Sequence, residues 1–406
     1  MSAPGPLAPT APFSVRRLRG ARVGVAICFF LNAVLYSNLV PRLPEIKAAL
    51  DLSNSSLGAA IAAMPLGALL AALWSAPLIR RFGSARVAST ALALLGVIVW
   101  FVAVAPNWGF LAAAFLVAGA LDAIIDVAQN AHGLRVQRLY KRSILNGLHG
   151  LWSIGAVSGG LLGSAAAGLA IPLSLHMGAS AIVFGIVALL VFRILLPGRD
   201  DDEREPEPVA TADGIPAPGR RTAVLALAAL GALGVCGAFV EDAGASWSAL
   251  YLRTELAAGA ATAGLGFVAL QGAMTIGRLT GDRIVDRFGQ RLVAQVGGAM
   301  IAAGMGLALA WPSVLTTLVG FALAGLGVAT LIPATYHAAD ELPGLRRGTG
   351  LAVINWLLRI GFLVSPLLIG VLADATSLRV ALVVVVVAGL GALTFGRVLR
   401  PTTAKA

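Results

Sequence analysis

Acidic and amide side chains share one face of an otherwise apolar segment, residues 109–132. Asp122, Asp126, Gln129 and Asn130 lie three or four residues apart, so a helix places them on one stripe. Burial disfavours a charged carboxylate, and two carboxylates one turn apart repel each other. Binding a proton relieves both penalties, so the spacing predicts proton uptake and release, or contact with a polar solute. A fixed ion pair and exposure to water are the alternatives.

A second pair of acids, Glu241 and Asp242, lies in the apolar segment 222–250. Glu241 is about ten residues from the end of that segment, well inside a membrane-spanning helix. We expect Glu241 and Asp242 to take part in proton coupling; the alternatives for Glu241 are contact with a solute and a salt bridge to Arg253 at an outer gate. Tyr36 occupies the position equivalent to Asp242 in an earlier segment, so the two are expected to face one cavity.

Further polar side chains occur inside other apolar segments, several of them at helical spacing. We expect the following to line a substrate cavity together with Gln129 and Asn130: Asn32, Tyr36, Asn146, His149, Gln271, Tyr336, Asn355 and Arg359. Hydrogen bonds between helices explain the amides equally well. His149 can relay a proton, although a structural role is favoured. Arg278 is expected to extend to the membrane surface, and Pro333 predicts a kink in its helix.

No pattern typical of an enzyme is present. The sequence has no His/Cys set with metal-ligand spacing, no phosphate-binding loop of the Walker type and no nucleophile elbow. Cys28 and Cys236 lie in separate apolar segments and are expected to be packing residues. The sequence therefore predicts neither catalysis nor a cofactor, and it excludes an ATP-driven pump on this chain. A proton gradient is the expected energy source.

The elements that position these residues are membrane helices. The chain is 58% hydrophobic and 12% charged, against about 45–50% and about 25% in a soluble domain. Crossing the hydrocarbon core takes roughly 20 apolar residues. Twelve segments meet that requirement: 20–41, 56–79, 86–105, 109–132, 143–169, 174–196, 222–250, 262–284, 291–311, 313–338, 349–373 and 378–399. The fold class predicted is an all-α integral membrane protein with twelve transmembrane helices.

Basic residues are distributed asymmetrically between the loops. Of the 30 Lys and Arg, 24 lie at the termini and in the even-numbered loops, and only four lie in the odd-numbered loops. The positive-inside rule then places both termini and the central loop in the cytoplasm. Three Lys against 27 Arg suggest a GC-rich bacterial genome. The net charge of +11 follows from this distribution, and no basic cluster with interleaved aromatics indicates nucleic-acid binding.

One stretch of the chain occurs twice at an offset of 206 residues. Arg81-Phe82-Gly83 corresponds to Arg287-Phe288-Gly289, and Gly119 corresponds to Gly325. A constant offset over some hundred residues indicates duplication of a whole unit. Parallel repeats in an apolar chain are typical of secondary transporters. The predicted organisation is a cytoplasmic tail (1–19), a six-helix bundle (20–196), a cytoplasmic linker (197–221), a second six-helix bundle (222–399) and a cytoplasmic tail (400–406).

The segment Gly281 to Arg291 resembles the cytoplasmic loop signature of the major facilitator superfamily. Asp286, Arg287, Gly289 and Arg291 match it, and Arg81 and Gly83 belong to the first-half copy, where Arg80 replaces the usual Asp. The resemblance implies that an Asp and an Arg of this signature pair with neighbouring helix ends to hold one gating state. Residues 126–133 and 247–253 are similar to a bacterial inner-membrane subgroup that is distantly related to the proton-coupled fucose permeases.

This resemblance implies alternating access around a central site between the two halves. The predicted function is proton-coupled transport of a small organic solute. The lipid bilayer is its expected surrounding, and no obligate protein partner is implied. Export of a drug or secondary metabolite is the first expectation. The cavity is expected to be mostly apolar, and residues 155–160 partly match an exporter motif. Proton symport of a sugar-like solute is the alternative, favoured by the amides. A membrane receptor and a uniporter are less favoured.

Overall fold

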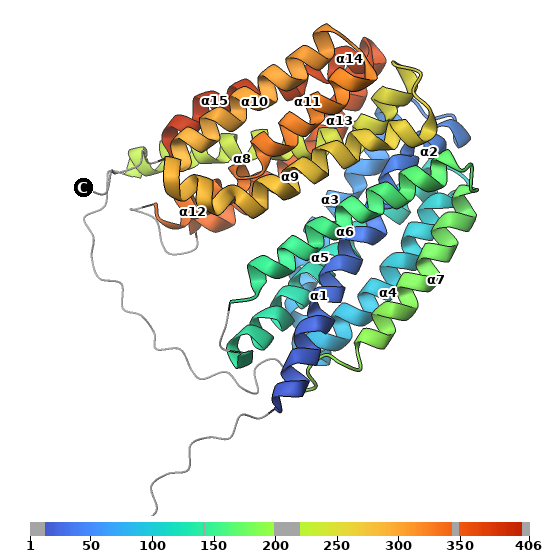
Figure 1. The fold of residues 1–406 in the computed structure, drawn as a ribbon, viewed down its shortest axis with the longest axis vertical. Coiled ribbons are helices and arrows are strands. Elements are labelled where there is room, and N and C mark those ends of the chain that lie inside the picture. Colours follow the sequence, from blue (N-terminus) through green and yellow to red (C-terminus); the bar gives the residue numbers. More distant parts are fainter. Residues whose placement is uncertain (1–12, 141–142, 199–219, 343–348, 400–406) are drawn as a thin grey trace, which may run out of the picture.

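The computed structural model describes residues 13–140, 143–198, 220–342 and 349–399, and their regular structure is helical. The N-terminal half comprises α1 (Val15–Ser37), η1 (Val40–Arg42), α2 (Leu43–Ala49), α3 (Asn54–Phe82), α4 (Ser84–Ala103), α5 (Trp108–Tyr140), α6 (Leu145–Gly168) and α7 (Leu173–Val191). The C-terminal half comprises α8 (Arg220–Thr254), α9 (Ala260–Phe288), α10 (Gln290–Ala310), α11 (Val314–Val328), α12 (Leu331–Asp340), α13 (Thr349–Ala375), α14 (Leu378–Ala381), α15 (Val383–Phe395) and η2 (Gly396–Val398). Figure 1 shows the halves as two adjacent bundles.

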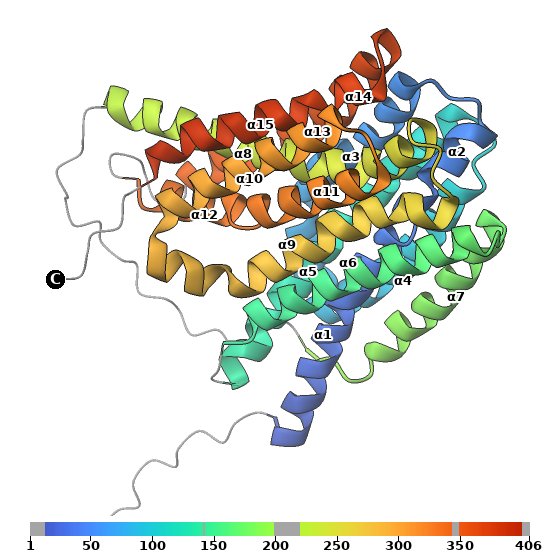
Figure 2. The ribbon, with the colours of Figure 1, turned by 45° about the horizontal axis from the view of Figure 1, so that its top comes forward.

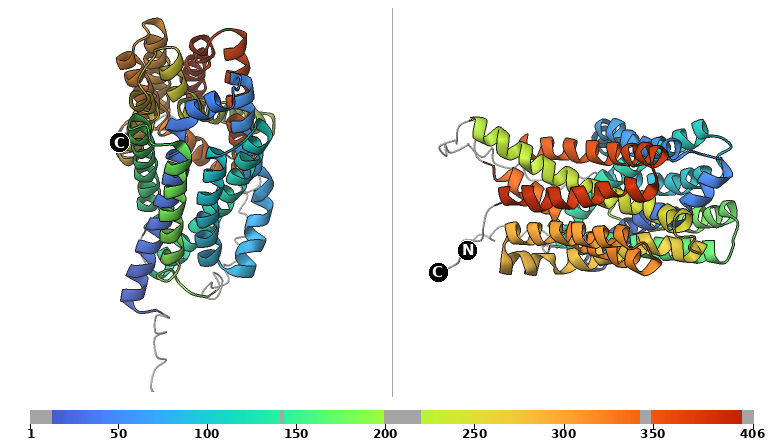
Figure 3. Two further views of the ribbon diagram at one scale, coloured as in Figure 1. Left: turned by 90° about the vertical axis from the view of Figure 1, so that its right-hand side faces the viewer. Right: turned by 90° about the horizontal axis from the view of Figure 1, so that it is seen from above.

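Twelve segments of the described chain are long and apolar enough to cross a membrane. Three of them are interrupted helices: α1 with η1 and α2, α11 with α12, and α14 with α15 and η2. Figure 3 shows the long helices of both halves running along a common direction, as a bilayer requires. The predicted fold class, twelve transmembrane helices in two six-helix pseudo-repeats, is confirmed. The predicted linker 197–221 lies mostly outside the described residues.

The repeat in the sequence is also a repeat in backbone geometry. Gly83 ends α3 with φ 81°, and Gly289 ends α9 with φ 80°. Only glycine adopts this left-handed region without strain, which explains its presence at both turns. The guanidinium of Arg81 lies 5.3 Å from the Phe82 ring centroid, and that of Arg287 lies 5.3 Å from the Phe288 ring centroid. The two duplicated units therefore fold alike at this turn.

The same contact between helices also occurs once in each half. A side chain at Gly119 of α5 would meet the backbone carbonyl of Met64 in α3, and one at Gly325 of α11 would meet that of Leu270 in α9. Both the glycines and their partners are 206 residues apart. Glycine lets these helices approach each other closely, as small residues do in membrane bundles.

We expect Gly119→Ala and Gly325→Ala each to lower the free energy of unfolding by about 1–3 kcal/mol, because a backbone carbonyl cannot move aside as a side chain can. Gly306→Ala is the matched control, since nothing lies within 4 Å of its added carbon. The control should be neutral or stabilising because Ala favours helix more than Gly does. Unfolding of the detergent-solubilised protein measures the difference. Equal stability of all three variants would contradict the predicted clash.

Pro333 accounts for the interruption of the tenth span. A proline has no N–H to donate to the carbonyl four residues earlier, here that of Ala329. The helix α11 ends at Val328, and α12 begins at Leu331. The predicted kink is therefore confirmed as a break between two helices, α11 and α12 (Figure 1).

The two halves meet mainly through α3 with α13 and through α6 with α9. They are in contact at the end of the bundle that carries η1 and α2, which we call the closed end. There a side chain at Gly370 would meet the Asn54 carbonyl, and one at Gly168 would lie 2.7 Å from the Ala261 side chain. At the other end, which we call the open end and which carries the turns at Gly83 and Gly289, the ribbons of the halves diverge (Figure 2).

Candidate functional site

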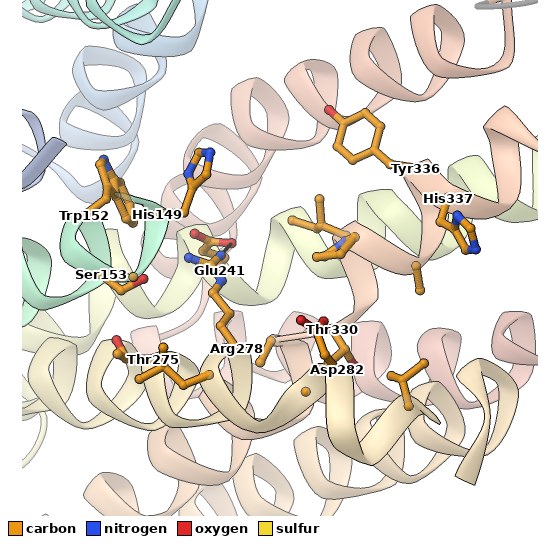
Figure 4. Close-up of a pocket in the computed structure, with 18 of the residues that line it drawn as sticks. His149, Trp152, Ser153, Glu241, Thr275, Arg278, Asp282, Thr330, Tyr336 and His337 are labelled. Atoms are coloured by element: carbon orange, nitrogen blue, oxygen red, sulfur yellow. Dashed lines mark hydrogen bonds and ion pairs between the residues drawn. The ribbon is translucent and has the colours of Figure 1, made fainter. Parts of the chain in front are cut away.

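A cavity of about 1030 Å³ lies between the halves and reaches the open end. Most of its surface is carbon, and polar groups project from it at separate points, as in most solute-binding sites. Helices of both halves contribute (Figure 4). The side chains that bear polar groups are Asn32, Asp122, Asp126, His149, Trp152, Ser153, Glu241, Thr275, Arg278, Asp282, Gln290, Thr330, Tyr336 and His337.

A chain of hydrogen bonds connects three helices of the N-terminal half at the cavity wall. Trp152 Nε1 of α6 donates to Asn32 Oδ1 of α1 at 2.8 Å, and Asn32 Nδ2 donates to Asp122 Oδ1 of α5 at 2.7 Å. Asn32 is 4% exposed, so its amide is fixed by this arrangement. The other carboxylate oxygen of Asp122 remains available for a proton or a solute.

The second carboxylate of the α5 stripe, Asp126, lies one turn from Asp122 and nearer the open end. Asn130 Nδ2 donates to Asp126 Oδ1 at 2.9 Å. His149 and Arg359 are close enough for their charges to act on Asp126, and Arg359 also acts on Asp122. Within the described residues neither carboxylate forms an ion pair. Both acids of the stripe therefore face the cavity. Among the described residues, their negative charges are offset only by positive groups that lie beyond ion-pair distance.

Glu241 of α8 has a direct partner. Its Oε2 lies 3.4 Å from Arg278 Nη2 of α9, with 18% and 32% of the two side chains exposed. Figure 4 shows Arg278 extending from α9 toward Glu241. The prediction that Arg278 extends to the membrane surface is therefore wrong, because a carboxylate within the same half attracts it into the cavity. The alternative partner Arg253 instead donates to the Ala258 carbonyl at 2.9 Å.

The C-terminal half also contributes the Tyr336 ring from α12. Its hydroxyl donates to Asn355 Oδ1 of α13 at 3.1 Å, and Asn355 itself does not line the cavity. His149 packs edge-on against Phe29, with ring centroids 5.1 Å apart, and still lines the cavity. Aromatic rings from both halves thus face the same space.

Several predicted cavity residues lie in the helix packing instead. Gln129 is 1% exposed and Gln271 is 4% exposed, and neither lines the cavity. Asp242 accepts a hydrogen bond from Ser246 at 3.0 Å. Tyr36 lies close enough to Asp242 for their groups to interact, as the repeat predicts, although neither lines the cavity. The side chain of Asn146 lies outside the described residues.

The residues of the loop signature lie at the open end. Asp286 and Arg287 are exposed, and Arg291 is partly buried in the first turn of α10. Among the described residues, Asp286 therefore has no ion-pair partner at the end where the halves have separated.

Several residues that were not predicted as cavity residues also line the cavity. Trp152 and Ser153 share a helix face with His149, and Asp282 lies one turn beyond Arg278, so helical spacing was the available signal. Thr275 lies one turn before Arg278, so the same signal applied to it, whereas Thr330 stands alone and His337 directly follows Tyr336. No group of three or more His, Cys, Asp or Glu in the described ranges could hold a metal ion.

Comparison with known proteins agrees with this architecture. A family model described as Major Facilitator Superfamily matches residues 25–240 and 231–406. The chain belongs to this superfamily. It is 29% identical to an uncharacterised MFS-type transporter of Yersinia pestis, over 89% of this chain and 91% of that protein.

Solved structures of superfamily members share the fold. The nucleoside transporter NupG aligns with a TM-score of 0.70 at 14% identity, over 93% of this chain and 98% of that chain. The E. coli fucose:proton symporter FucP aligns with a TM-score of 0.59 at 17% identity, over 94% and 98%. The predicted membership of the superfamily is confirmed, and with it a multi-pass membrane protein of a transporter family.

Proposed function

We propose that this protein is a proton-coupled secondary active transporter that moves a small organic solute by alternating access. The observation that carries the proposal is Asp122, a carboxylate in the cavity between the halves with one oxygen held by Asn32 and no ion pair to a described residue. A charge in this position is costly unless it is neutralised. Taking up a proton or a solute changes that cost and so biases the equilibrium between conformations.

The positive-inside distribution supports a cytoplasmic position for the open end. The conformation described is then inward-open, with the cavity accessible from the cytoplasm and the closed end facing outward. A cell inner membrane with both termini cytoplasmic is the proposed location. Exposure of Asp286 and Arg287 at the open end agrees with this assignment, since the signature residues are expected to pair when that end closes.

Export by proton antiport is the first candidate for the direction, and the largely carbon surface of the cavity favours it. The partial exporter motif does not add support, because side chains at Gly155 and Gly159 would meet the Phe30 and Val34 carbonyls of α1. These two glycines are explained by helix packing. Symport of a polar solute is the second candidate, favoured by the Trp152–Asn32–Asp122 hydrogen bonds and by the fold shared with a fucose:proton symporter.

Membrane vesicles of both orientations distinguish the two candidates. A panel of sugars, nucleosides and cationic and neutral antibiotics is added to energised everted vesicles and to right-side-out vesicles. Dissipation of the pH gradient in everted vesicles by a panel compound establishes antiport and export. Proton uptake together with a solute in right-side-out vesicles establishes symport. Flux that does not depend on the gradient in either orientation would contradict proton coupling.

A further inference from the structure

The closed end contains a polar contact between the two halves. Asp374 lies in the last turn of α13, in the C-terminal half, and α3 of the N-terminal half begins beside it. Asn54 N–H donates to Asp374 Oδ1 at 2.8 Å, and Ser55 N–H donates to Asp374 Oδ2 at 2.8 Å. The Asp374 carboxylate thus contacts two residues that lie 320 and 319 positions earlier in the chain.

This carboxylate completes the capping of α3. The first N–H groups of a helix have no partner within it and carry partial positive charge. Ser53 Oγ accepts from the N–H of Ser56 at 3.0 Å, as an N-cap residue does. Asp374 accepts hydrogen bonds from the two preceding N–H groups of the helix, those of Asn54 and Ser55. A residue of one half therefore supplies the remaining cap of a helix in the other half, with charge-assisted hydrogen bonds.

The equivalent position in the other half carries no such group. An offset of 206 places Gly168, at the end of α6, where Asp374 lies in the second copy. Gly168 lies against the Ala261 side chain in the first turn of α9. The pseudo-symmetric interface between the halves thus contains the polar contact on one side and apolar packing on the other.

We propose that the contact of Asp374 with the N–H groups of Asn54 and Ser55, here called the interhalf clamp, holds the closed end shut and is broken whenever the transporter opens outward. The inference rests on alternating access, because opening the closed end separates the first turn of α3 from the last turn of α13. Weakening the clamp then raises the population of the outward-open state.

Two substitutions weaken the clamp from opposite sides. Asp374→Ala removes the acceptor. Asn54→Pro removes one donor and keeps the helix, because proline is favoured at the first helical position and Ser53 already has the extended backbone that precedes proline. Asp51→Asn is the matched control: it removes an acidic charge at the same end from an exposed residue that forms no ion pair with the described residues.

The populations are read from distances between spin labels, with Cys28 and Cys236 replaced by alanine. One labelled pair, Pro106→Cys with Pro312→Cys, reports the closed end, and both positions are exposed turns of opposite halves. A second labelled pair, in a separate variant, reports the open end from two further exposed positions in α4 and α10. No solute is needed, so the result does not depend on proton coupling or on the identity of the solute.

Asp374→Ala is expected to shift the population ratio about three- to tenfold toward the state with a long closed-end distance and a short open-end distance. Asn54→Pro should give a smaller shift in the same direction, and the double variant should shift no further than Asp374→Ala. Unchanged distances in Asp374→Ala, or an equal shift in Asp51→Asn, would overturn the clamp. If the distances shift as expected but the solute drives no proton flux, the clamp is supported and the proposed proton coupling is refuted.

Discussion

Asp122→Asn is expected to abolish proton-driven accumulation of the solute while leaving passive exchange of the solute intact. Asparagine has the size of aspartate and still accepts the hydrogen bond from Asn32, but it cannot carry a proton through the cycle. One proton moving down a potential of about 100 mV supplies about 2.3 kcal/mol, equivalent to an accumulation of roughly 50-fold. That accumulation should be lost. Gradient-driven transport and counterflow, measured side by side, separate the two activities.

Asp282→Asn is the control for this variant. Asp282 also lines the cavity, but it belongs to the last turns of α9 near the open end and not to the α5 stripe. It should retain accumulation. Undiminished accumulation in Asp122→Asn would show that another group carries the proton, and Asp126 would be the first to examine.

Glu241→Gln and Arg278→Gln are each expected to reduce the rate of transport about tenfold, because each leaves one unpaired charge in a largely carbon-lined cavity. The double variant Glu241→Gln/Arg278→Gln should recover part of that rate, since no unpaired charge remains. Initial rates of all four proteins give the coupling between the two positions.

Arg253→Gln serves as the control for the loss of a basic side chain, because Arg253 contacts only a backbone carbonyl among the hydrogen bonds described. If the double variant were as inactive as the worse single variant, Glu241 would have a role beyond neutralising Arg278. Proton transfer at Glu241 would then replace the structural role assigned here.

The fold could be predicted because membrane helices obey local rules. Length and hydrophobicity define each span without reference to its neighbours, and the constant offset of 206 defines the repeat. The pairs Gly119–Met64 and Gly325–Leu270 show how completely the repeat extends to packing, since the same contact forms twice. The interruption at Pro333 follows equally from one residue, through the hydrogen bond that it cannot donate.

The site could be predicted only in part, because helical spacing says which residues share a face and not which neighbour covers it. Asp122 and Asp126 reach the cavity, whereas Gln129 of the same stripe is buried between helices. Arg278 turns inward because Glu241 of another helix lies within reach. Such outcomes depend on the rotation of each helix against its neighbours, which packing determines.

The Asp374 contact had no signal in the sequence. Its partners are backbone N–H groups, which every residue but proline possesses, and they lie more than 300 positions away. Only the association of the two halves gives Asp374 a helix N-terminus to contact.

Simultaneous measurement of proton and solute movement in proteoliposomes of the purified protein tests the central claim most directly. A pH-sensitive dye is enclosed, the active compound of the panel is added on one side, and wild type is compared with Asp122→Asn. We predict that wild type moves protons together with the solute in a fixed ratio and that Asp122→Asn moves solute without protons. Solute flux in wild type with no accompanying proton movement would contradict proton coupling.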